Sequence, residues 1–349
     1  MNTTIVKKDI RLLTKTQMEE IVLQLGEKKF RANQIHEWLW QRAAMSFDDM
    51  TNLSKEFRQK LQDNFDINNI HEDKMQRSSD GTLKGRYRLH DGHLIEAVLI
   101  PVPVDNRFTV CVSTQVGCSL TCTFCATGRM GRVRNLEAAE IYDQFVSINR
   151  HSLDTFNHPL TNVVYMGMGE PLLNYANTLK SVALISEGFN FSPKRITVST
   201  AGIAKMIKKL ADDDVKFNLA LSLHAADDEK RNKIMPINEQ NNLKVLVEAL
   251  DYFYKKTRNR ITFEYIAFQN FNDTLQDAAN LVKICKRIPA RVNIIEYNPI
   301  DNAPFEKSAE ANIDNFAQYL SDHDIAVTVR KSRGKDIDAA CGQLANKDL

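Results

Sequence analysis

The chain has 349 residues, 43% of them hydrophobic, with 46 Lys and Arg against 44 Asp and Glu. This composition excludes a wholly disordered chain, and no stretch reaches the ~18 uninterrupted apolar residues that a membrane-spanning helix needs. Residues 1–20 contain no apolar signal-peptide core, so we expect a cytoplasmic protein, in which the net charge of +2 leaves a nucleic-acid partner open.

Residues 1–75 are predicted to form a helical accessory domain. Apolar residues recur three or four positions apart in segments 14–26, 30–44 and 53–65, as they do on one-sided helices. Ser46 and Ser54 are suitable helix caps. The basic residues of this domain could face RNA, although a solvated surface is the commoner explanation for such charges.

A β-hairpin is predicted at residues 76–104, as a linker between the helical domain and the rest of the chain. Asp91-Gly92 is a favoured two-residue turn, and the segments on both sides of it carry strand-forming residues.

From residue 105 to residue 335, strand-like and helix-like segments alternate. Six β-branched or aromatic runs are each followed by a helical pattern, and a last strand follows at 325–331. This alternation indicates right-handed βαβ units and a mostly parallel sheet. The units are too few for a closed eight-stranded barrel, so we predict an α/β fold with a partial, TIM-like (β/α)6 barrel and a separate C-terminal segment at 336–349.

Polar or otherwise unusual residues follow several of the predicted strands. Because the carboxyl ends of parallel strands gather the chemistry of such folds, one shared pocket is expected there. The residues in question are Cys118, Cys122 and Cys125, the GMGEP segment at 167–171, Ser199, Ser222, Leu223, His224 and Asn298.

The three cysteines after the first predicted strand have the spacing C-x3-C-x2-C. Thiolates at such close spacing favour an Fe–S cluster, zinc or Cu(I). Structural zinc usually has four protein ligands, and no fourth Cys or His follows nearby in the sequence. Cys118, Cys122 and Cys125 would therefore leave one iron of a 4Fe–4S cluster open to an outside ligand.

Several segments together resemble one family. Residues 111–128, 163–175, 217–238 and 327–344 are similar to the RlmN/Cfr family of radical S-adenosylmethionine (SAM) RNA adenine methyltransferases, and segments 30–42 and 46–61 are similar to its RlmN branch. The resemblance covers essentially the whole chain. It implies a radical SAM barrel and a 4Fe–4S cluster that is held by Cys118, Cys122 and Cys125 and binds SAM at its open iron.

The resemblance also implies which residues contact SAM, of which two are used per turnover. Taken singly, each of these residues has an ordinary explanation, since Gly-rich turns and strand-terminal polar residues are common. The expected contacts are Gly169, Glu170, Ser199, Ser222, Leu223, His224 and Asn298.

Three further residues are given catalytic roles by the resemblance alone. Cys341 would be methylated by one SAM and would then form an adduct with RNA, Cys111 would resolve that adduct through a transient disulfide with Cys341, and Glu96 would accept a proton. Without the resemblance, Cys341 is a free cysteine near the end of the chain and Cys111 an apolar residue of a strand. Glu96 is a carboxylate in an apolar strand, which requires a partner or a purpose. Cys285 matches no catalytic position.

The resemblance implies methylation at C2 of an adenosine in the peptidyl transferase centre of 23S rRNA and of the adenosine 3′ of the anticodon in tRNAs. Flavodoxin or ferredoxin would supply electrons, and we expect a monomer. Two alternatives stay open, Cfr-type methylation at C8 and a zinc-stabilised RNA-binding protein without catalysis. Cations at the pocket could neutralise phosphates, and for each of them a solvated basic surface is an equally good interpretation; the candidates are Arg129, Arg132, Arg134, Arg330, Lys331, Arg333 and Lys335.

Overall fold

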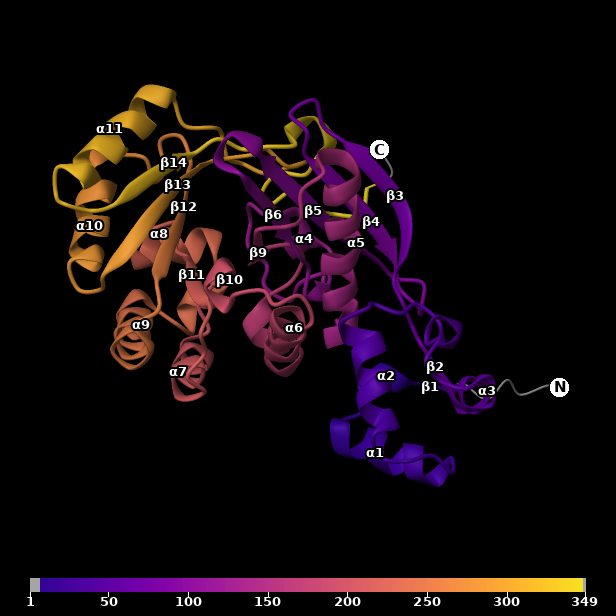
Figure 1. Cartoon of the computed structure of the whole chain (residues 1–349). Helices are drawn as coiled ribbons and strands as arrows, with labels where there is room; N and C mark the ends of the chain where they lie inside the picture. Colours follow the sequence, from indigo (N-terminus) through magenta and orange to yellow (C-terminus); the bar gives the residue numbers. More distant parts are fainter. Residues whose placement is uncertain (1–6, 348–349) are drawn as a thin grey trace.

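A computed structural model describes residues 7–347 of the chain. The predicted helices of the N-terminal part are confirmed up to residue 64, as α1 (Lys15–Gln24), α2 (Arg31–Trp40) and α3 (Lys55–Asn64). Ser54 caps α3 as expected, because its side chain accepts a hydrogen bond of 3.2 Å from the backbone N–H of Phe57. The three helices project away from the large sheet (Figure 1).

A 3-10 turn and a short pair of strands complete this N-terminal part. Ser46, the other predicted cap, precedes the 3-10 turn at Phe47–Asp49. Strand β1 (Lys8–Asp9) pairs in parallel with β2 (Phe65–Asp66). The residues before and after the helices are therefore held together.

The helical prediction for residues 1–75 is wrong at its end, where β3 (His71–Arg77) is a strand. This segment consists mostly of polar residues and lies at the edge of the sheet, where it pairs in antiparallel fashion with β4 (Leu83–Arg88). Its own sequence lacks the apolar alternation of a half-buried strand. Pairing with β4 therefore holds this segment in the conformation of a strand.

The hairpin expected around Asp91-Gly92 is confirmed as β4 and β5 (Leu94–Val102). It is, however, more than a linker, because β5 also pairs with β6 (Arg107–Cys111), which makes the hairpin part of a ten-stranded sheet. Strand β5 is largely buried, and a buried strand needs hydrogen-bonding partners on both of its edges.

The remaining strands of the large sheet are parallel, as the alternating pattern predicted. Seven strands in the order β6-β9-β10-β11-β12-β13-β14 form an open barrel wall. Six of them are followed by a helix, so the (β/α)6 prediction is confirmed. The strands after β6 are β9 (Asn162–Tyr165), β10 (Ile196–Thr200), β11 (Asn218–Ser222), β12 (Ile261–Ala267), β13 (Ala290–Glu296) and β14 (Val327–Arg330).

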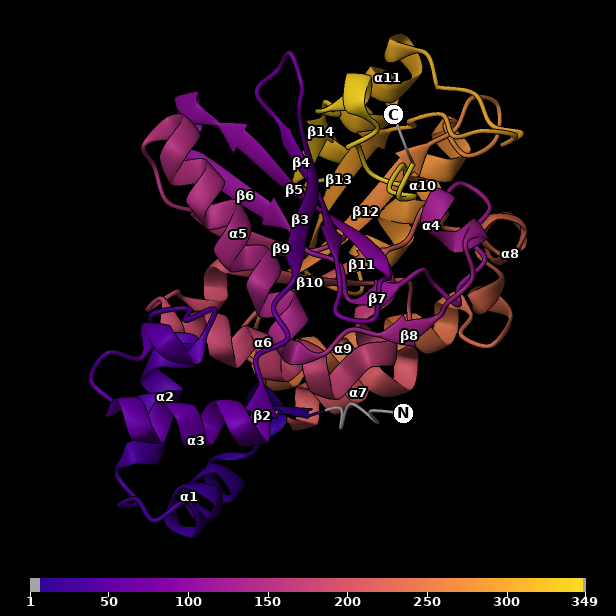
Figure 2. The ribbon, with the colours of Figure 1, turned by 90° about the vertical axis from the view of Figure 1, so that its right-hand side faces the viewer.

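The helices that follow these strands cover the convex side of the sheet (Figures 1 and 2). Shorter helices and a small hairpin lie at the carboxyl ends of the strands. The long helices are α5 (Ala138–Phe156), α6 (Tyr175–Gly188), α7 (Ala204–Asp212), α9 (Leu243–Thr257), α10 (Leu275–Cys285) and α11 (Glu310–Ser321); the short elements are α4 (Ala126–Arg129), α8 (Asp228–Ile234), β7 (Gln115–Val116) and β8 (Arg134–Asn135).

The register of the strands defines one continuous concave face. Residues that pair side by side in a ladder point to the same side of the sheet, and this side alternates along each strand. Val110, Val163, Phe263 and Val292 are completely buried in the main core, so their strand neighbours point to the opposite, concave side. By register these are Lys84, Arg86, Glu96, Cys111, Ser199, Ser222, Glu264, Asn293 and Arg330.

The chain leaves β14 and returns across this concave face (Figure 2). We call residues 331–347 the tail. Within the described part of the chain, no helix is long and apolar enough to cross a membrane.

Candidate active site

The three clustered cysteines lie in the loop between β7 and α4, at the carboxyl end of the first parallel strand, as expected. Cys118 is buried, and Cys122 and Cys125 are partly buried. Burial raises the pKa of Cys118 to about 11, and the neighbouring Cys125 adds to this effect. Burial and the other two cysteines raise the pKa of Cys122 as well. The loop therefore disfavours free thiolates, whereas a coordinated metal stabilises them.

The chemistry of the three thiols fits an iron–sulfur cluster. Soft thiolates are ligands that such clusters take, and a 4Fe–4S cluster takes each thiolate at a different iron. Cys118, Cys122 and Cys125, all free in this structure, would therefore hold three irons and leave the fourth open.

The Gly-rich turn after β9 packs directly against the start of the cysteine loop. A Cβ atom on Gly167 would lie 2.7 Å from Oγ of Ser113, and one on Gly169, at φ +96°, would lie 2.5 Å from Cβ of Gln115. Only glycine permits this approach and this backbone conformation.

Glu170 follows this turn and is buried. Its carboxylate accepts hydrogen bonds from the backbone N–H groups of Leu172 (2.9 Å) and Ala201 (2.7 Å). Burial raises its pKa to about 6 in spite of these bonds. Each carboxylate oxygen can accept a second hydrogen bond, so Glu170 ties β9 to β10 and can still bind a cationic ligand.

The polar residues at the ends of β10 and β11 are neighbours, as predicted. The Oγ atoms of Ser199 and Ser222 are 3.4 Å apart, and both side chains belong to the concave face. Leu223 is buried in the main core. Asn298, beyond β13, donates through Nδ2 to the backbone carbonyl of Cys341 at 3.4 Å.

His224 is buried in a left-handed conformation at φ +55°. Its Nδ1 accepts a hydrogen bond of 3.1 Å from the backbone N–H of Ile266, and the ring of Phe124 meets it edge-on with centroids 4.9 Å apart. Burial lowers the pKa of His224 to about 3, and Arg231 adds to this. The imidazole is therefore neutral.

Arg231 in α8 was missed in the sequence analysis. It is completely buried and donates to the backbone carbonyls of Leu223 (3.0 Å) and Ala201 (2.6 Å). Burial lowers its pKa to about 10, while the nearby Cys122 opposes this change. This guanidinium fixes the strand ends below the cysteine loop. The one signal in the sequence that could have identified Arg231 is its position inside segment 217–238, which resembles the family.

Cys341 lies in the tail on the concave face, next to the cysteine loop. The backbone N–H of Ala126 donates to the carbonyl of Gly342 at 2.7 Å, and Oγ1 of Thr127 donates to the carbonyl of Leu344 at 2.6 Å. Cys341 is exposed, whereas Cys111 on β6 is buried.

Burial raises the pKa of Cys111, and the charge of Cys341 adds to this, so the two side chains lie within electrostatic reach. All six cysteines are free, so the structure has no disulfide between Cys111 and Cys341.

Glu96 holds the tail in place. It is buried, and its Oε2 accepts hydrogen bonds from the backbone N–H groups of Ala345 (2.9 Å) and Asn346 (3.1 Å). Its Oε1 lies 3.3 Å from Nζ of the buried Lys84, which also donates to the carbonyl of Asp338 at 3.4 Å. With the tail in this position, both oxygens of the predicted proton acceptor are occupied.

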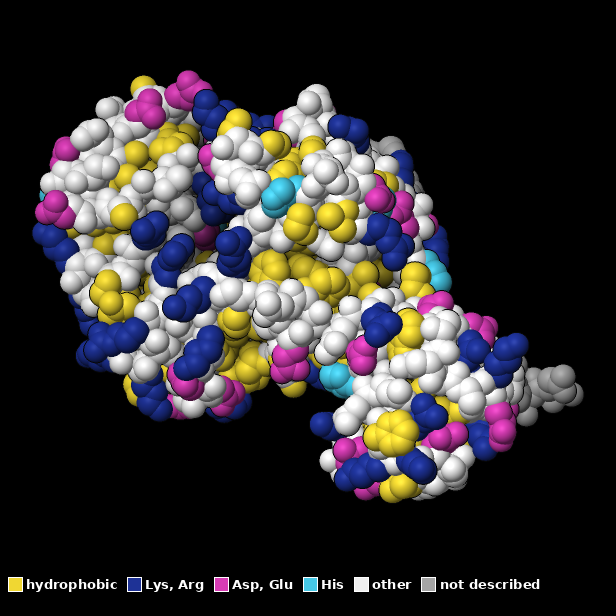
Figure 3. Space-filling model, viewed as in Figure 1, with side chains coloured by type: hydrophobic (Ala, Val, Ile, Leu, Met, Phe, Trp, Pro, Cys, Tyr) yellow, Lys and Arg dark blue, Asp and Glu magenta, His cyan; other side chains and the backbone are white. Residues whose placement is uncertain are grey.

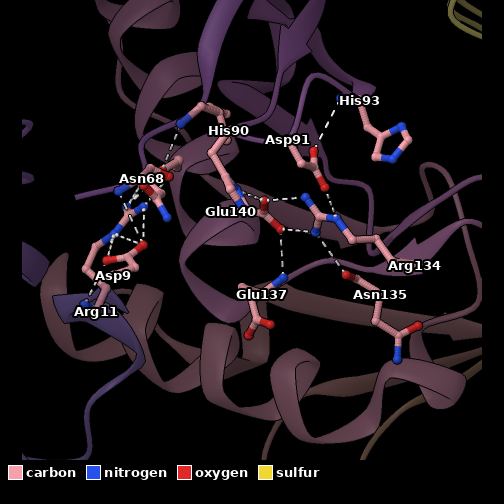
Figure 4. A network of polar contacts seen from close by, with 12 residues as sticks. Asp9, Arg11, Asn68, His90, Asp91, His93, Arg134, Asn135, Glu137 and Glu140 are labelled. Atoms are coloured by element: carbon pink, nitrogen blue, oxygen red, sulfur yellow. Dashed lines mark hydrogen bonds and ion pairs between the residues drawn. The ribbon is translucent and has the colours of Figure 1, made fainter. Parts of the chain in front are cut away.

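Most of the cations proposed for RNA binding are engaged within the protein. Arg134 forms ion pairs with Asp91 (2.5 Å) and Glu140 (2.8 Å), which join β8 to the β4–β5 turn and to α5 (Figure 4). Arg129 donates to the backbone carbonyls of Asp301 and Asn302, so neither arginine is a free surface cation.

The other cations proposed for RNA binding differ in whether they have a partner within the protein. Lys335 pairs with Glu296 and Arg333 donates to the carbonyl of Asp80 at 3.4 Å. Arg132, Arg330 and Lys331 are exposed. Lys and Arg side chains also surround a hollow on the face away from α4 (Figure 3). Basic side chains are thus found on more of the surface than the two segments around the pocket that the sequence indicated.

Comparisons with known proteins bear on the whole chain. Residues 9–67 match the family model of the ribosomal RNA large subunit methyltransferase N-terminal domain, and residues 112–282 match that of the radical SAM superfamily. The chain is 57% identical to a probable dual-specificity RNA methyltransferase RlmN of Christiangramia forsetii, over 98% of this chain and 97% of the relative. It is 55% identical to the protein of the same description from Flavobacterium psychrophilum, over 99% of both chains.

A solved structure is similar over nearly the full length as well. The crystal structure of a radical SAM methyltransferase from Sphaerobacter thermophilus is 39% identical to this chain, with a TM-score of 0.90, and the match covers 97% of this chain and 99% of that one.

Proposed function

The chain belongs to the RlmN family of dual-specificity radical SAM RNA methyltransferases, and we propose that it methylates C2 of one adenosine in the peptidyl transferase centre of 23S rRNA and C2 of the adenosine 3′ of the anticodon in tRNAs. The observation that carries this proposal is the position of Cys341, an exposed thiol beside the cysteine loop and within electrostatic reach of Cys111. C2 of adenine is electron-poor and is not a nucleophile. A methyl carrier that can be attacked by a radical is therefore needed, and a cysteine at this place can serve as one.

In this proposal Cys118, Cys122 and Cys125 hold a 4Fe–4S cluster with one open iron. When bound, the cluster and SAM supply a 5′-deoxyadenosyl radical by reductive cleavage, with electrons from a donor such as flavodoxin or ferredoxin. Two SAM molecules are used per turnover. The residues that bind SAM are Gly169, Glu170, Ser199, Ser222, Leu223, His224 and Asn298.

The chain's own residues then perform the transfer. Cys341 takes up a methyl group, presents it for activation and becomes bonded to the adenine. Cys111 releases the RNA by attacking the sulfur of Cys341, which forms a transient disulfide, while Glu96 accepts the ring proton. Because Glu96 holds the tail at Ala345 and Asn346, this last role requires the tail to move away from Glu96 during turnover.

We further propose that the N-terminal helical part binds RNA and that the protein acts as a cytoplasmic monomer. The match of residues 9–67 to the N-terminal domain of rRNA methyltransferases supports the first statement. The target adenosine must leave its stack to reach the pocket, as is general for base-modifying enzymes.

Nucleoside mass spectrometry of rRNA and tRNA tests the proposal. Cells that lack this protein should contain no 2-methyladenosine at the two sites, the wild-type gene should restore it, and the variant Cys341→Ala should not. In the same cells Cys111→Ala should leave RNA covalently bound to the protein. Detection of 8-methyladenosine would instead assign the chain the Cfr-type reaction, and unchanged RNA would contradict both assignments.

A further inference from the structure

Glu264 is a buried carboxyl group to which the mechanism above gives no role. It lies in β12, it is 4% exposed, and its Oε1 accepts a hydrogen bond of 2.8 Å from Nδ2 of Asn293 in β13. Its other oxygen, Oε2, is buried and has no hydrogen-bond partner among residues 7–347. A buried polar atom of this kind is costly and requires an explanation.

The strand register directs Glu264 to the concave face. It pairs with Ser222 on β11 and with Asn293 on β13. Two positions further along the same side, Ile266 and Ile295 belong to the apolar cluster that contains Phe124 of the cysteine loop. The side chain of Glu264 therefore belongs to the wall over which the tail passes.

Cys341 lies within electrostatic reach of this carboxyl group. Although Cys341 as a residue is exposed, the protein around its thiol desolvates it and raises its pKa; among charged groups Glu264 is the first to add to this, while Arg330 opposes it. Arg330 also lowers the pKa of Glu264, although burial raises it more strongly. The groups that face Glu264 are thus Ser222 from β11, Asn293 from β13, Arg330 from β14 and Cys341 from the tail.

We propose that Glu264 is the proton acceptor for the thiol of Cys341 when SAM methylates it. In this step the Cys341 sulfur forms a bond to the methyl carbon, the bond between that carbon and the SAM sulfonium breaks, and S-adenosylhomocysteine leaves. The thiol proton passes to Oε2 of Glu264, so charge and atoms balance without an oxidant or reductant. The inference rests on the proposed function, because it presupposes that Cys341 is the methyl acceptor.

Two features make Glu264 suited to this task. Oε2 of Glu264 is engaged by no other described residue, unlike the oxygens of Glu96, which the tail and Lys84 occupy; to deliver its proton, the Cys341 thiol has only to approach within hydrogen-bond distance of Oε2. Burial also makes its carboxylate a stronger base than an exposed one, which brings it closer to the range that favours general-base catalysis.

The first test is the initial rate of Cys341 methylation in cluster-loaded enzyme with saturating SAM and no reductant, followed by peptide mass. We expect Glu264→Gln to lower the rate roughly 100-fold, as is typical for loss of a general base, and to remove the acid limb of the pH profile. Arg330→Gln should shift that limb to higher pH, because a neighbouring cation is lost. Glu248→Gln, on the exposed side of α9, is the matched control and should behave as wild type.

The second test uses the protein without SAM, in which iodoacetamide alkylates Cys341. Removal of the negative charge should lower the pKa of the thiol, so Glu264→Gln should be alkylated faster at neutral pH although SAM methylates it more slowly. A variant that is merely misfolded would not separate the two rates in opposite directions.

Three results would overturn the inference. The first is a methylation rate of Cys341 in Glu264→Gln that equals the wild-type rate. The second is a change of the methylation rate and the alkylation rate of this variant in the same direction and by the same factor. The third is a weaker affinity of this variant for SAM with an unchanged methylation rate at saturating SAM. If Glu264→Gln does not fold, an unshifted pH limb in Arg330→Gln would overturn it instead. Failure of the wild-type protein to methylate Cys341 would contradict the proposed function itself, before any variant is compared.

Discussion

Two walls of the concave face meet the tail from opposite sides, and each contains a buried carboxyl group. On the wall formed by β4 and β5, Glu96 is fully partnered by Lys84 and two backbone N–H groups of the tail. On the wall formed by β11–β14, Glu264 has one partner in Asn293 and one free oxygen. The same residue type therefore anchors the chain on one wall and is left available on the other.

The difference shows how a flexible segment can carry a reactive residue and still be positioned. The β4–β5 wall holds the tail by charge-assisted hydrogen bonds beyond Cys341, at Ala345 and Asn346. The opposite wall supplies polar groups that the tail does not saturate, among them Ser222 and Glu264. The first wall holds the tail beyond Cys341, while Ala126, Thr127 and Asn298 hold it at Cys341, Gly342 and Leu344. The second wall presents polar side chains that remain available for chemistry.

The largest expected effect comes from removing the charge of Glu96 on the wall formed by β4 and β5. Glu96→Gln should lower the free energy of unfolding by about 3–5 kcal/mol, because it leaves Lys84 buried without a counter-charge. Urea unfolding measures this change, and faster trypsin cleavage after Lys331 would report release of the tail. The double variant with Lys84→Met should recover part of the loss, whereas additive losses would show that the two residues do not interact.

An intermediate effect concerns the wall of β11 and β12 and depends on pH. The pKa of His224 is lowered from 6.5 to about 3 in the folded protein, so below pH 6.5 the unfolded chain binds a proton that the folded chain does not. Stability should therefore fall as the pH falls, by about 2 kcal/mol at pH 5 from this residue. The variant His224→Asn, which suits the left-handed backbone, should lose this contribution.

Unfolding midpoints of both proteins at pH 7 and pH 5 measure the His224 contribution as a difference. The comparison with the variant is necessary because Glu170 acts in the opposite direction. Its pKa is raised to about 6, so protonation stabilises the fold as the pH falls from 6 towards 4.5. Equal pH slopes in wild type and His224→Asn would contradict the assignment of a neutral, buried imidazole.

The smallest expected effect is that of Glu264→Gln on stability. Among residues 7–347, Oε2 of Glu264 has no hydrogen-bond partner and Glu264 has no ion pair of the kind that holds Glu96. The isosteric amide should therefore change the free energy of unfolding by about 1 kcal/mol or less. Urea unfolding under the conditions used for Glu96→Gln gives the direct comparison. A loss as large as that of Glu96→Gln would mean that the two walls are equally structural.

Particular residues show where the sequence sufficed and where it did not. The rule that a carboxylate in an apolar strand requires a partner or a purpose pointed to Glu96, and it applies equally to Glu264 in ITFEYIAF, which the sequence analysis passed over. Arg134 was one candidate for neutralising RNA phosphates, with a solvated surface as the alternative, and it pairs with Asp91 and Glu140. Its partners are 43 and 6 residues away, so local composition did not reveal them.

By itself the sequence determined the alternation of strands and helices, the hairpin at Asp91-Gly92 and the cysteine loop after the first parallel strand, because periodicity, turn residues and close spacing are local properties. Only the tertiary structure decided that β3 is a strand, that the hairpin belongs to the main sheet, and that Lys84 and Glu96 hold the segment with Cys341. These features depend on pairing and charge compensation between residues up to 254 positions apart, and such contacts stabilise the protein only when the folded sheet brings the residues together.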